Sequence, residues 1–190
     1  MTGPIPNLDP GARLSIYGVS QSGKSFLADK LANAWGRSRA IVIINPMEAD
    51  PPALPIGDGA SSLRPGIYRV SPTTPHQCRR QMLETLILSQ RAHPVTLICD
   101  EASEYLDKDM PEMRRVFNSG RHRGLGTVIV SQSQTDIAPT YRKNTVATVY
   151  FAMTAQAEVN LITSQDRDLA AKVRKLRQGQ HLIYRSGMGG

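Results

Sequence analysis

The chain has 190 residues, enough to bury a sizeable core but with little room for a second large domain. Its 23 Lys and Arg residues outnumber its 16 Asp and Glu residues, and the formal net charge of +7 favours a polyanionic partner such as nucleic acid. No apolar run is long enough to span a bilayer, and residues 1–10 lack the pattern of a signal peptide. We therefore expect one soluble, intracellular domain over 1–190, with a core at about 13–186 and a frayed tail at 187–190.

Short apolar runs alternate along the chain with longer segments, several of helical period. Continuous apolar runs are typical of strands buried on both faces, and helices between them provide the crossovers that parallel strands need. The sequence therefore predicts an α/β fold with a mostly parallel, twisted sheet flanked by helices on both faces. The predicted strands lie at 13–18, 40–45, 66–70, 95–100, 127–132, 147–153 and 181–184.

Two of the intervening segments carry clear helix signals. In the segment that follows the predicted strand 66–70, Thr74, Pro75 and Gln77 have the order of a capping box with proline at the first helical position. We expect that helix to run to about Gln90. In both segments, apolar residues recur at four-residue steps, which places them on one stripe. These residues are Leu27, Leu31 and Trp35 in the first helix, and Cys78, Met82 and Leu86 in the second.

The stretch 45–66 is the one long irregular segment, and it holds five prolines. Loops of this length in compact domains are usually functional or mobile. A variable surface excursion explains the stretch equally well.

A glycine-rich stretch, GVSQSGKS, follows the first predicted strand and precedes the first predicted helix. It fits the phosphate-binding loop (P-loop) pattern, in which backbone N–H groups and a helix N-terminus bind phosphate oxygens. Lys24 would reach the β- and γ-phosphates, and the Ser25 hydroxyl would bind Mg²⁺. A chance glycine turn before a helix is the alternative. The predicted nucleotide-binding residues are Gly18, Val19, Ser20, Gln21, Ser22, Gly23, Lys24 and Ser25.

Two acidic residues, Asp100 and Glu101, follow the apolar run VTLIC. Asp100 would hold Mg²⁺ through its water shell, and Glu101 would polarise the attacking water as a general base. This pair favours hydrolysis over transfer to a bound acceptor. A strand that merely ends in two solvated acids is the alternative.

The next predicted strand, TVIVSQ, ends in Ser131 and Gln132. Because ligands collect at the carboxyl ends of strands in an open parallel sheet, we expect this strand and the two preceding motifs to meet at one site. Gln132 would then hydrogen-bond the γ-phosphate or its attacking water.

The segment NSGRHRGLG, just before that strand, carries Arg121 and Arg123. An arginine that enters a neighbouring subunit's nucleotide site stabilises the charge on the transferring phosphoryl group. Such a finger requires an oligomer, most simply a ring. Arg142, in TYRKNT, is a second candidate position, and the pattern does not choose among the three. Solvated loop arginines and contacts to DNA phosphates are the alternatives.

Four segments, taken in order, resemble the FtsK/HerA superfamily of nucleic-acid-translocating ATPases: GVSQSGKS, LICDEA, SGRHRGLGTVIVSQSQTDIAPTYRKNTVATVYFAMT and LRQGQHLIYRSG. The resemblance covers most of 13–186. It implies a RecA-like P-loop core that assembles as a hexamer with an arginine finger supplied in trans. It also implies that Asp100 and Glu101 form the Walker B pair and that Gln132 is the sensor. Several family members have Gln-Arg-Pro or Gln-Pro where this chain has SQSQ, so Gln134 is the alternative sensor.

A bare core of this size is similar to the genome-packaging ATPases of tailless viruses with an internal membrane and a double-jelly-roll capsid. The resemblance implies a motor that uses ATP and Mg²⁺ to translocate double-stranded DNA. It would dock on a portal or capsid vertex, in the host cytoplasm or with the virion, without inserting into a membrane. A plasmid, conjugative or chromosomal translocase of the same superfamily shares every motif, and a P-loop small-molecule kinase is a more distant alternative.

Overall fold

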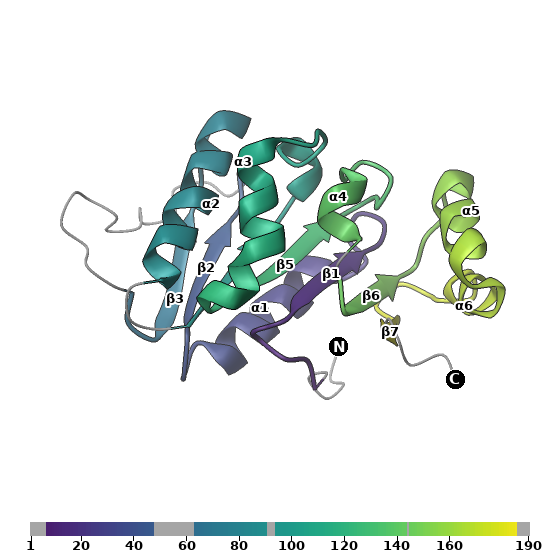
Figure 1. Ribbon diagram of the computed structural model, residues 1–190. Coiled ribbons are helices and arrows are strands. Elements are labelled where there is room, and N and C mark those ends of the chain that lie inside the picture. The colour runs from purple at the N-terminus through teal and green to yellow at the C-terminus, as the bar shows by residue number, and fades with distance from the viewer. Residues whose placement is uncertain (1–6, 48–62, 91–93, 144, 186–190) are drawn as a thin grey trace.

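The computed structural model describes residues 7–47, 63–90, 94–143 and 145–185. The strands form one seven-stranded sheet in the order β3-β2-β4-β5-β1-β6-β7 (Figure 1). All neighbouring strands pair in parallel except β7, which runs antiparallel to β6 at one edge. The strands are β1 (Arg13–Tyr17), β2 (Ala40–Ile44), β3 (Gly66–Val70), β4 (Val95–Cys99), β5 (Leu125–Ser131), β6 (Ala147–Phe151) and β7 (His181–Arg185).

The apolar runs of the sequence form the strands, and their burial follows their position in the sheet. The inner strands β2, β4, β5 and β6 are buried along their whole length, as expected for strands that are covered on both faces. The edge strands β3 and β7 are only partly buried. The predicted α/β fold with a mostly parallel sheet is therefore confirmed.

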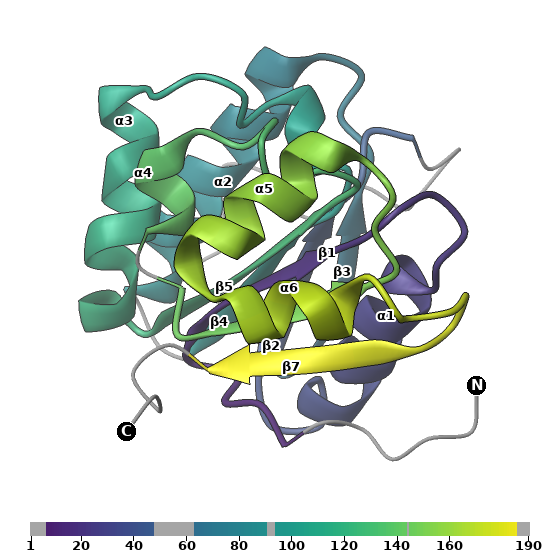
Figure 2. The ribbon, with the colours of Figure 1, turned by 90° about the vertical axis from the view of Figure 1, so that its right-hand side faces the viewer.

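Helices cover both faces of the sheet, but unequally. Helix α1 covers one face, where its Leu27 and Leu31 pack in a cluster with Ile16 and Val128 of the central strands. The other face is covered by the remaining helices, through a larger cluster that includes Met82 (Figure 2). The helices are α1 (Lys24–Trp35), α2 (Pro75–Ser89), α3 (Pro111–Arg114), α4 (Pro139–Arg142), α5 (Gln156–Gln165) and α6 (Arg167–Val173). Between β4 and β5 lie three further short turns, η1 (Ala102–Glu104), η2 (Arg115–Ser119) and η3 (Gly120–Arg123).

Helix α2 shows how closely the local signals specify its ends. The Thr74 hydroxyl accepts a hydrogen bond from the Gln77 backbone N–H at 3.2 Å, as the predicted cap requires. The Gln77 side chain returns to the backbone N–H of Thr73, at 3.0 Å, so the capping box is shifted by one residue. The helix ends at Ser89, one residue before the predicted end. Most of the proline-rich stretch, 48–62, and the tail at 187–190 lie outside the described residues.

Candidate nucleotide-binding site

Three predicted motifs meet at one edge of the sheet because β4, β5 and β1 are adjacent and parallel. Tyr17 pairs with Ser131, so the next residue of each strand brings the start of the glycine-rich loop level with Gln132. In the same way, the pairing of Cys99 with Ile129 places Asp100 and Glu101 directly beyond the end of β4, beside the last residues of β5. The carboxyl ends of these strands therefore carry the P-loop, the acidic pair and the glutamine side by side.

The glycine-rich loop is held by tight packing at its start. The Val19 backbone N–H donates to the carbonyl oxygen of Ala152, beyond the end of β6, at 3.0 Å. A Cβ atom on Gly18 would lie 2.5 Å from the Cβ of Phe151, closer than such atoms approach, so only glycine fits there. Gln21, within the loop, has a left-handed backbone with φ of 59°. The loop thus combines a position that only glycine fits with a non-glycine residue in a strained backbone conformation.

The N-terminus of α1 is suited to an anion. The helix begins at Lys24 with Gly23 as its N-cap, and no side chain caps its first N–H groups or places an acid in its first turn. These N–H groups and the positive end of the helix are therefore available to a phosphate. The Lys24 ammonium donates to the carbonyl oxygen of Val19 across the loop, at 2.9 Å. Its burial lowers the pKa of Lys24, and the nearby carboxylates of Glu101 and Asp100 oppose that shift.

The Asp100 carboxylate lies against the start of α1, only 5% exposed. It accepts hydrogen bonds from the Glu101 backbone N–H at 3.0 Å, from the Asn45 amide at 3.3 Å and from the Ser25 hydroxyl. Burial raises the pKa of Asp100, and the Glu101 N–H hydrogen bond offsets part of that shift. A hydroxyl and a carboxylate in contact form a pair of oxygen ligands of the kind Mg²⁺ prefers.

The structure brings together the two residues predicted to hold Mg²⁺, Ser25 and Asp100, and they fit the ion by donor type. Among the described residues, no cluster of three or more His, Cys, Asp or Glu side chains could hold a metal on its own. A cation here would complete its shell with water and phosphate oxygens, which is the usual manner of Mg²⁺ binding in nucleotide sites.

Glu101, half-buried, has a left-handed backbone with φ of 46°. Non-glycine residues in this region carry strain of about 1–3 kcal/mol, and such strain is concentrated at functional sites. The turn η1 begins directly after Glu101. The strained residue therefore sits where the chain turns sharply away from the end of β4.

The two glutamines that the sequence left as alternative sensors, Gln132 and Gln134, differ in their exposure. Gln132 is exposed at the carboxyl end of β5, whereas Gln134 is 3% exposed and has a buried amide nitrogen without a hydrogen-bond partner. The loop between them is held by Glu158 of α5, itself 3% exposed. The Glu158 carboxylate accepts hydrogen bonds from the Ser133 hydroxyl, the Gln134 N–H, and both the N–H and hydroxyl of Thr135.

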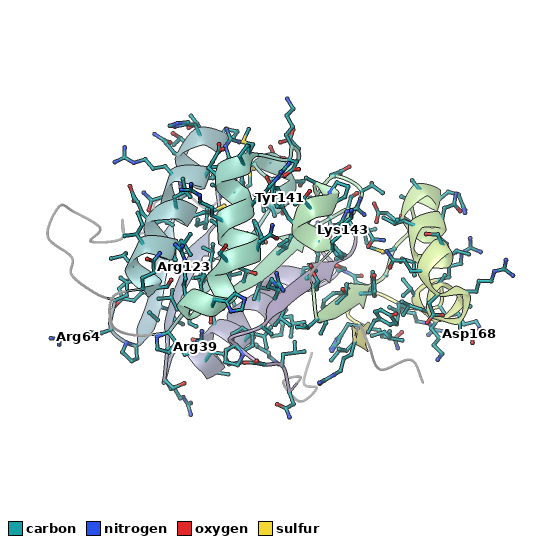
Figure 3. The ribbon with its side chains drawn as sticks, in the orientation of Figure 1. Arg39, Arg64, Arg123, Tyr141, Lys143 and Asp168 are labelled. Carbon is teal, nitrogen blue, oxygen red and sulfur yellow. The ribbon has the colours of Figure 1, made fainter. Side chains whose placement is uncertain are left out.

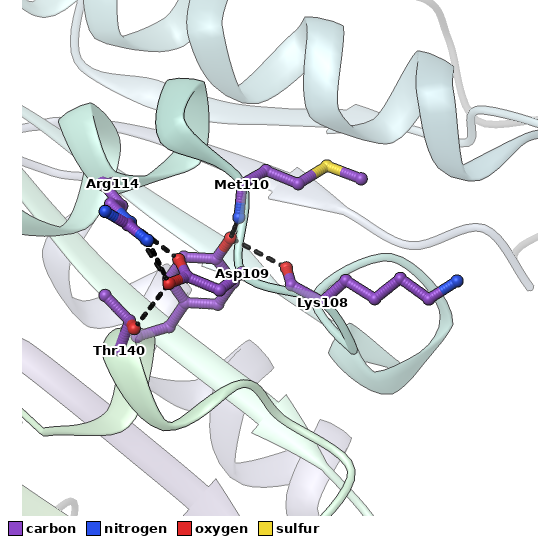
Figure 4. A network of polar contacts seen from close by, with 6 residues as sticks. Lys108, Asp109, Met110, Arg114 and Thr140 are labelled. Carbon is purple, nitrogen blue, oxygen red and sulfur yellow. Dashed lines mark hydrogen bonds and ion pairs between the residues drawn. The ribbon is translucent and has the colours of Figure 1, made fainter.

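The loop after η1 is tied to α4 by the polar network shown in Figure 4. Arg114 donates three hydrogen bonds to Asp109, at 3.0, 3.2 and 2.6 Å, and the Thr140 hydroxyl donates a fourth at 3.0 Å. The Tyr141 hydroxyl accepts from the Met110 N–H at 2.7 Å and donates to a backbone carbonyl at 2.9 Å. The segment that follows the acidic pair is therefore fastened to the element that follows β5.

Two of the three predicted arginines do not lie at this edge of their own chain. Arg121 and Arg123 belong to η3, which precedes β5, so they lie at the amino edge of the sheet. The seven residues of β5 separate the two edges by about 20 Å. Figure 3 shows Arg123, whose side chain is exposed, near Arg39 at this end. Arg142 lines a pocket on the α4–α5 face of the sheet and has a buried, unpartnered Nε.

Three contacts at the candidate site had no recognisable motif in the sequence. Asn45 follows the apolar run of β2, a position at the same carboxyl edge that topology alone could have suggested. Glu158 lies in an ordinary helical segment, and nothing local distinguishes it from a solvated residue. The Gln178 amide donates to the carbonyl oxygen of Gln21 at 3.3 Å, across 157 positions of the sequence.

A glycine-rich loop between a central parallel strand and a helix, facing an acidic pair at the end of a nearby strand, defines the class of P-loop NTPases. The structure thus has the fold that the motifs predicted. No described helix has the length and apolar character needed to cross a membrane.

Comparison with solved structures agrees with this fold. The genome-packaging NTPase B204 of Sulfolobus turreted icosahedral virus 2, in complex with AMPPCP, matches with a TM-score of 0.80 and 20% identity over 93% of each chain. B204 described as the DNA-packaging ATPase of Sulfolobus turreted icosahedral virus matches with a TM-score of 0.74 and 20% identity over 94% of each chain.

A more distant likeness is to the N-terminal domain of zonular occludens toxin from Neisseria meningitidis, with a TM-score of 0.50 and 13% identity over 91% of this chain and 93% of that one. No family model and no curated protein sequence matches the chain. The likeness to B204 confirms the fold.

Proposed function

We propose that the chain is an ATP-hydrolysing motor subunit that translocates double-stranded DNA, most specifically in viral genome packaging. The observation that carries the proposal is the meeting of the P-loop, the Asp100–Glu101 pair and Gln132 at the carboxyl ends of three adjacent strands. B204, which has this fold, is described as a genome-packaging NTPase and was solved with AMP, AMPPCP and ATP-gammaS. The basic charge of the chain suits a DNA backbone.

Each residue then has a role that follows from its position. Lys24 turns from the Val19 carbonyl to the β- and γ-phosphates, while Ser25 and Asp100 hold Mg²⁺, which neutralises phosphate charge. Glu101 orients and deprotonates the attacking water. The exposed amide of Gln132 contacts the γ-phosphate or this water, whereas the buried Gln134 lacks that access.

We assign the trans arginine to the η3 turn, at Arg121 or Arg123, rather than to Arg142. A residue at the amino edge of one chain reaches a nucleotide at the carboxyl edge only if that nucleotide belongs to another chain. Such head-to-tail contact is heterologous, and it closes into a ring when the rotation between copies allows. A hexamer with DNA in its channel is the assembly we propose, docked on a portal or capsid vertex.

The decisive experiment measures phosphate release by the wild type and Glu101→Gln, with and without long double-stranded DNA. We expect DNA to stimulate the wild type, and Glu101→Gln to bind ATP but lose turnover by about 10²-fold or more. Glu104→Gln, the same change at an exposed side chain three residues away, should leave the rate unaltered. A rate indifferent to both DNA and Glu101→Gln contradicts the motor, and phosphate transfer to a nucleoside would establish a kinase.

Mixing inactive subunits tests the assignment of the arginine. Lys24→Ala and Arg123→Ala are each expected to be inactive, because one lacks the lysine and the other the trans contact. In an equal mixture that exchanges subunits, about one interface in four combines an intact loop with an intact arginine. Recovery of activity to about that fraction supports Arg123 as the finger. No recovery moves the assignment to Arg121, which the same mixture tests.

The other DNA translocases of the superfamily share this site. Packaging is favoured over them by the likeness in fold to B204, over nearly the whole of both chains. Stimulation by the vertex protein of a virus, rather than by DNA alone, distinguishes the two.

A further inference from the structure

A pocket of about 460 Å³ opens on the face of the sheet that α4 and α5 cover, away from the P-loop. Its floor is formed by β1 and β6, through Tyr17 and Tyr150, and its walls by residues of α4, α5 and β7. Neither the glycine-rich loop from Gly18 to Ser25 nor the Asp100–Glu101 pair contributes to its lining. The pocket is therefore distinct from the candidate nucleotide site.

Buried polar atoms without partners line this pocket. The Gln134 amide nitrogen and the Arg142 Nε are buried and make no hydrogen bond within the described chain, and the Tyr17 hydroxyl, also buried, has the Ser15 side chain as a hydrogen-bond partner. Tyr17 is only 2% exposed and Gln134 only 3%. Burying such a group without a partner costs about 1–3 kcal/mol, so unpaired donors gathered around one cavity indicate that something else satisfies them.

The charge of the lining selects an anion. Arg142 and Lys143 supply two cationic side chains, and the lining contains no Asp or Glu. Figure 3 shows Lys143 beside α4, on the side toward β6. Glu158 of α5 faces Tyr17 from behind this lining, but its carboxylate is already engaged by the loop at 133–135. A guanidinium with a free Nε presents the fork that binds phosphate or carboxylate oxygens in pairs.

The rest of the pocket suits a hydroxylated organic group attached to that anion. The rings of Tyr17 and Tyr150 lie with their centroids 6.3 Å apart, and the hydroxyls of Ser15 and Thr148 lie beside them, where Ser15 hydrogen-bonds Thr145 at 3.1 Å and Thr148 hydrogen-bonds Tyr150. Burial raises the pKa of Tyr17 to about 12, so its hydroxyl stays a neutral donor at physiological pH. Hydroxyls and aromatic faces together are the surfaces that bind sugars.

We propose that this pocket is a second ligand site that binds a small organic phosphate, with the phosphate on Arg142 and Lys143 and a sugar-like group against Tyr17 and Tyr150. The site goes beyond the proposed motor function and does not depend on it. Tyr17 directly precedes the P-loop, and Gln134 lies two residues beyond Gln132. A ligand in the pocket would therefore contact residues next to both the phosphate-binding loop and the loop after β5.

The test is calorimetric titration of ribose 5-phosphate into protein whose P-loop is already saturated with Mg²⁺ and a non-hydrolysable ATP analogue. We expect one additional site per chain. Arg142→Gln should weaken that binding about tenfold or more, and Lys143→Gln by a smaller factor, because the paired guanidinium bonds are the stronger ones. Arg174→Gln, the same charge change at an exposed helix C-cap, is the matched control and should bind as the wild type does.

Two further measurements keep the outcome clear. Circular dichroism and thermal melting verify that each variant is folded, and Tyr17→Phe, which removes only the hydroxyl, should weaken binding by a few fold. Absence of titration heat with ribose 5-phosphate overturns the proposal, as does binding that Arg142→Gln leaves unchanged. Equal affinity for inorganic phosphate and ribose 5-phosphate overturns the organic part of the ligand. A crystal structure with the phosphate on Arg142 would confirm it.

Discussion

Replacement of Glu158 is the sharpest test of how the loop after β5 is held. One carboxylate oxygen accepts three of the four hydrogen bonds, from Ser133 and twice from Thr135, and the other accepts the Gln134 N–H. Glu158→Ala removes all four and leaves two backbone N–H groups without an acceptor, each costing about 1–3 kcal/mol. We therefore expect the free energy of unfolding to fall by about 3–5 kcal/mol.

Glu158→Gln is expected to cost less, because its amide oxygen still accepts the three bonds from Ser133 and Thr135. Its amide nitrogen then faces the Gln134 N–H, so one bond is lost and two donors oppose each other, a cost of about 1–2 kcal/mol. Glu104→Ala, at an exposed position, should stay within about 0.5 kcal/mol.

Urea unfolding measures these differences, followed by the fluorescence of the single tryptophan, Trp35. This residue lies in the core on the opposite face of the sheet, so its signal reports unfolding rather than the substitution itself. The reasoning fails if Glu158→Ala costs less than about 1 kcal/mol, or if the alanine and glutamine variants lose the same stability. In the ATPase assay, Glu158→Ala should lower turnover more than nucleotide affinity, because it loosens the loop after Gln132.

Three other perturbations test the site and the core. Gly18→Ala should abolish phosphate binding or destabilise the fold by about 1–3 kcal/mol, measured by nucleotide titration and urea unfolding, because its Cβ meets Phe151. Burial lowers the pKa of His181 below its ordinary 6.5. The His181 side chain therefore binds a proton more readily in the unfolded chain than in the folded one. The free energy of unfolding should have its full value above pH 6.5 and fall as the pH drops through the lowered pKa, with a shallower dependence in His181→Gln. Burial raises the pKa of Cys78 to about 11 and that of Cys99 further. Both thiols should therefore resist a disulfide reagent at pH 8 in the folded protein, and both should react once urea unfolds it.

The fold could be predicted because its signals are local and agree with one another. Each apolar run became a strand, and the four-residue spacing of Leu27, Leu31 and Trp35 became the buried stripe of α1. The order of the strands was not predictable in this way, since it depends on packing between segments distant in the sequence. The antiparallel β7 is an example, because its run HLIY carries no sign of its direction.

The parts of the candidate site that are formed by local sequence motifs could be predicted. The glycine-rich loop and the Asp100–Glu101 pair were found from the sequence, and the structure places them together. The anchoring of the loop by Glu158 was not found, because the local sequence around a helical glutamate is the same whether its carboxylate is solvated or buried. Only the tertiary fold brings the hydrogen-bond donors of residues 133–135 to this carboxylate. The same holds for Arg142, whose pocket exists only once β1, α4 and α5 are assembled.

The left-handed backbones of Gln21 and Glu101 have a consequence for adaptation. Among the described residues they are the only non-glycine positions with positive φ, and both belong to the candidate nucleotide-binding site. Selection for heat resistance alone would be expected to relax these two positions toward glycine, gaining stability where strain is released. A lineage that keeps both side chains under thermal stress must instead reinforce its core and surface, so stability and chemistry compete at this site.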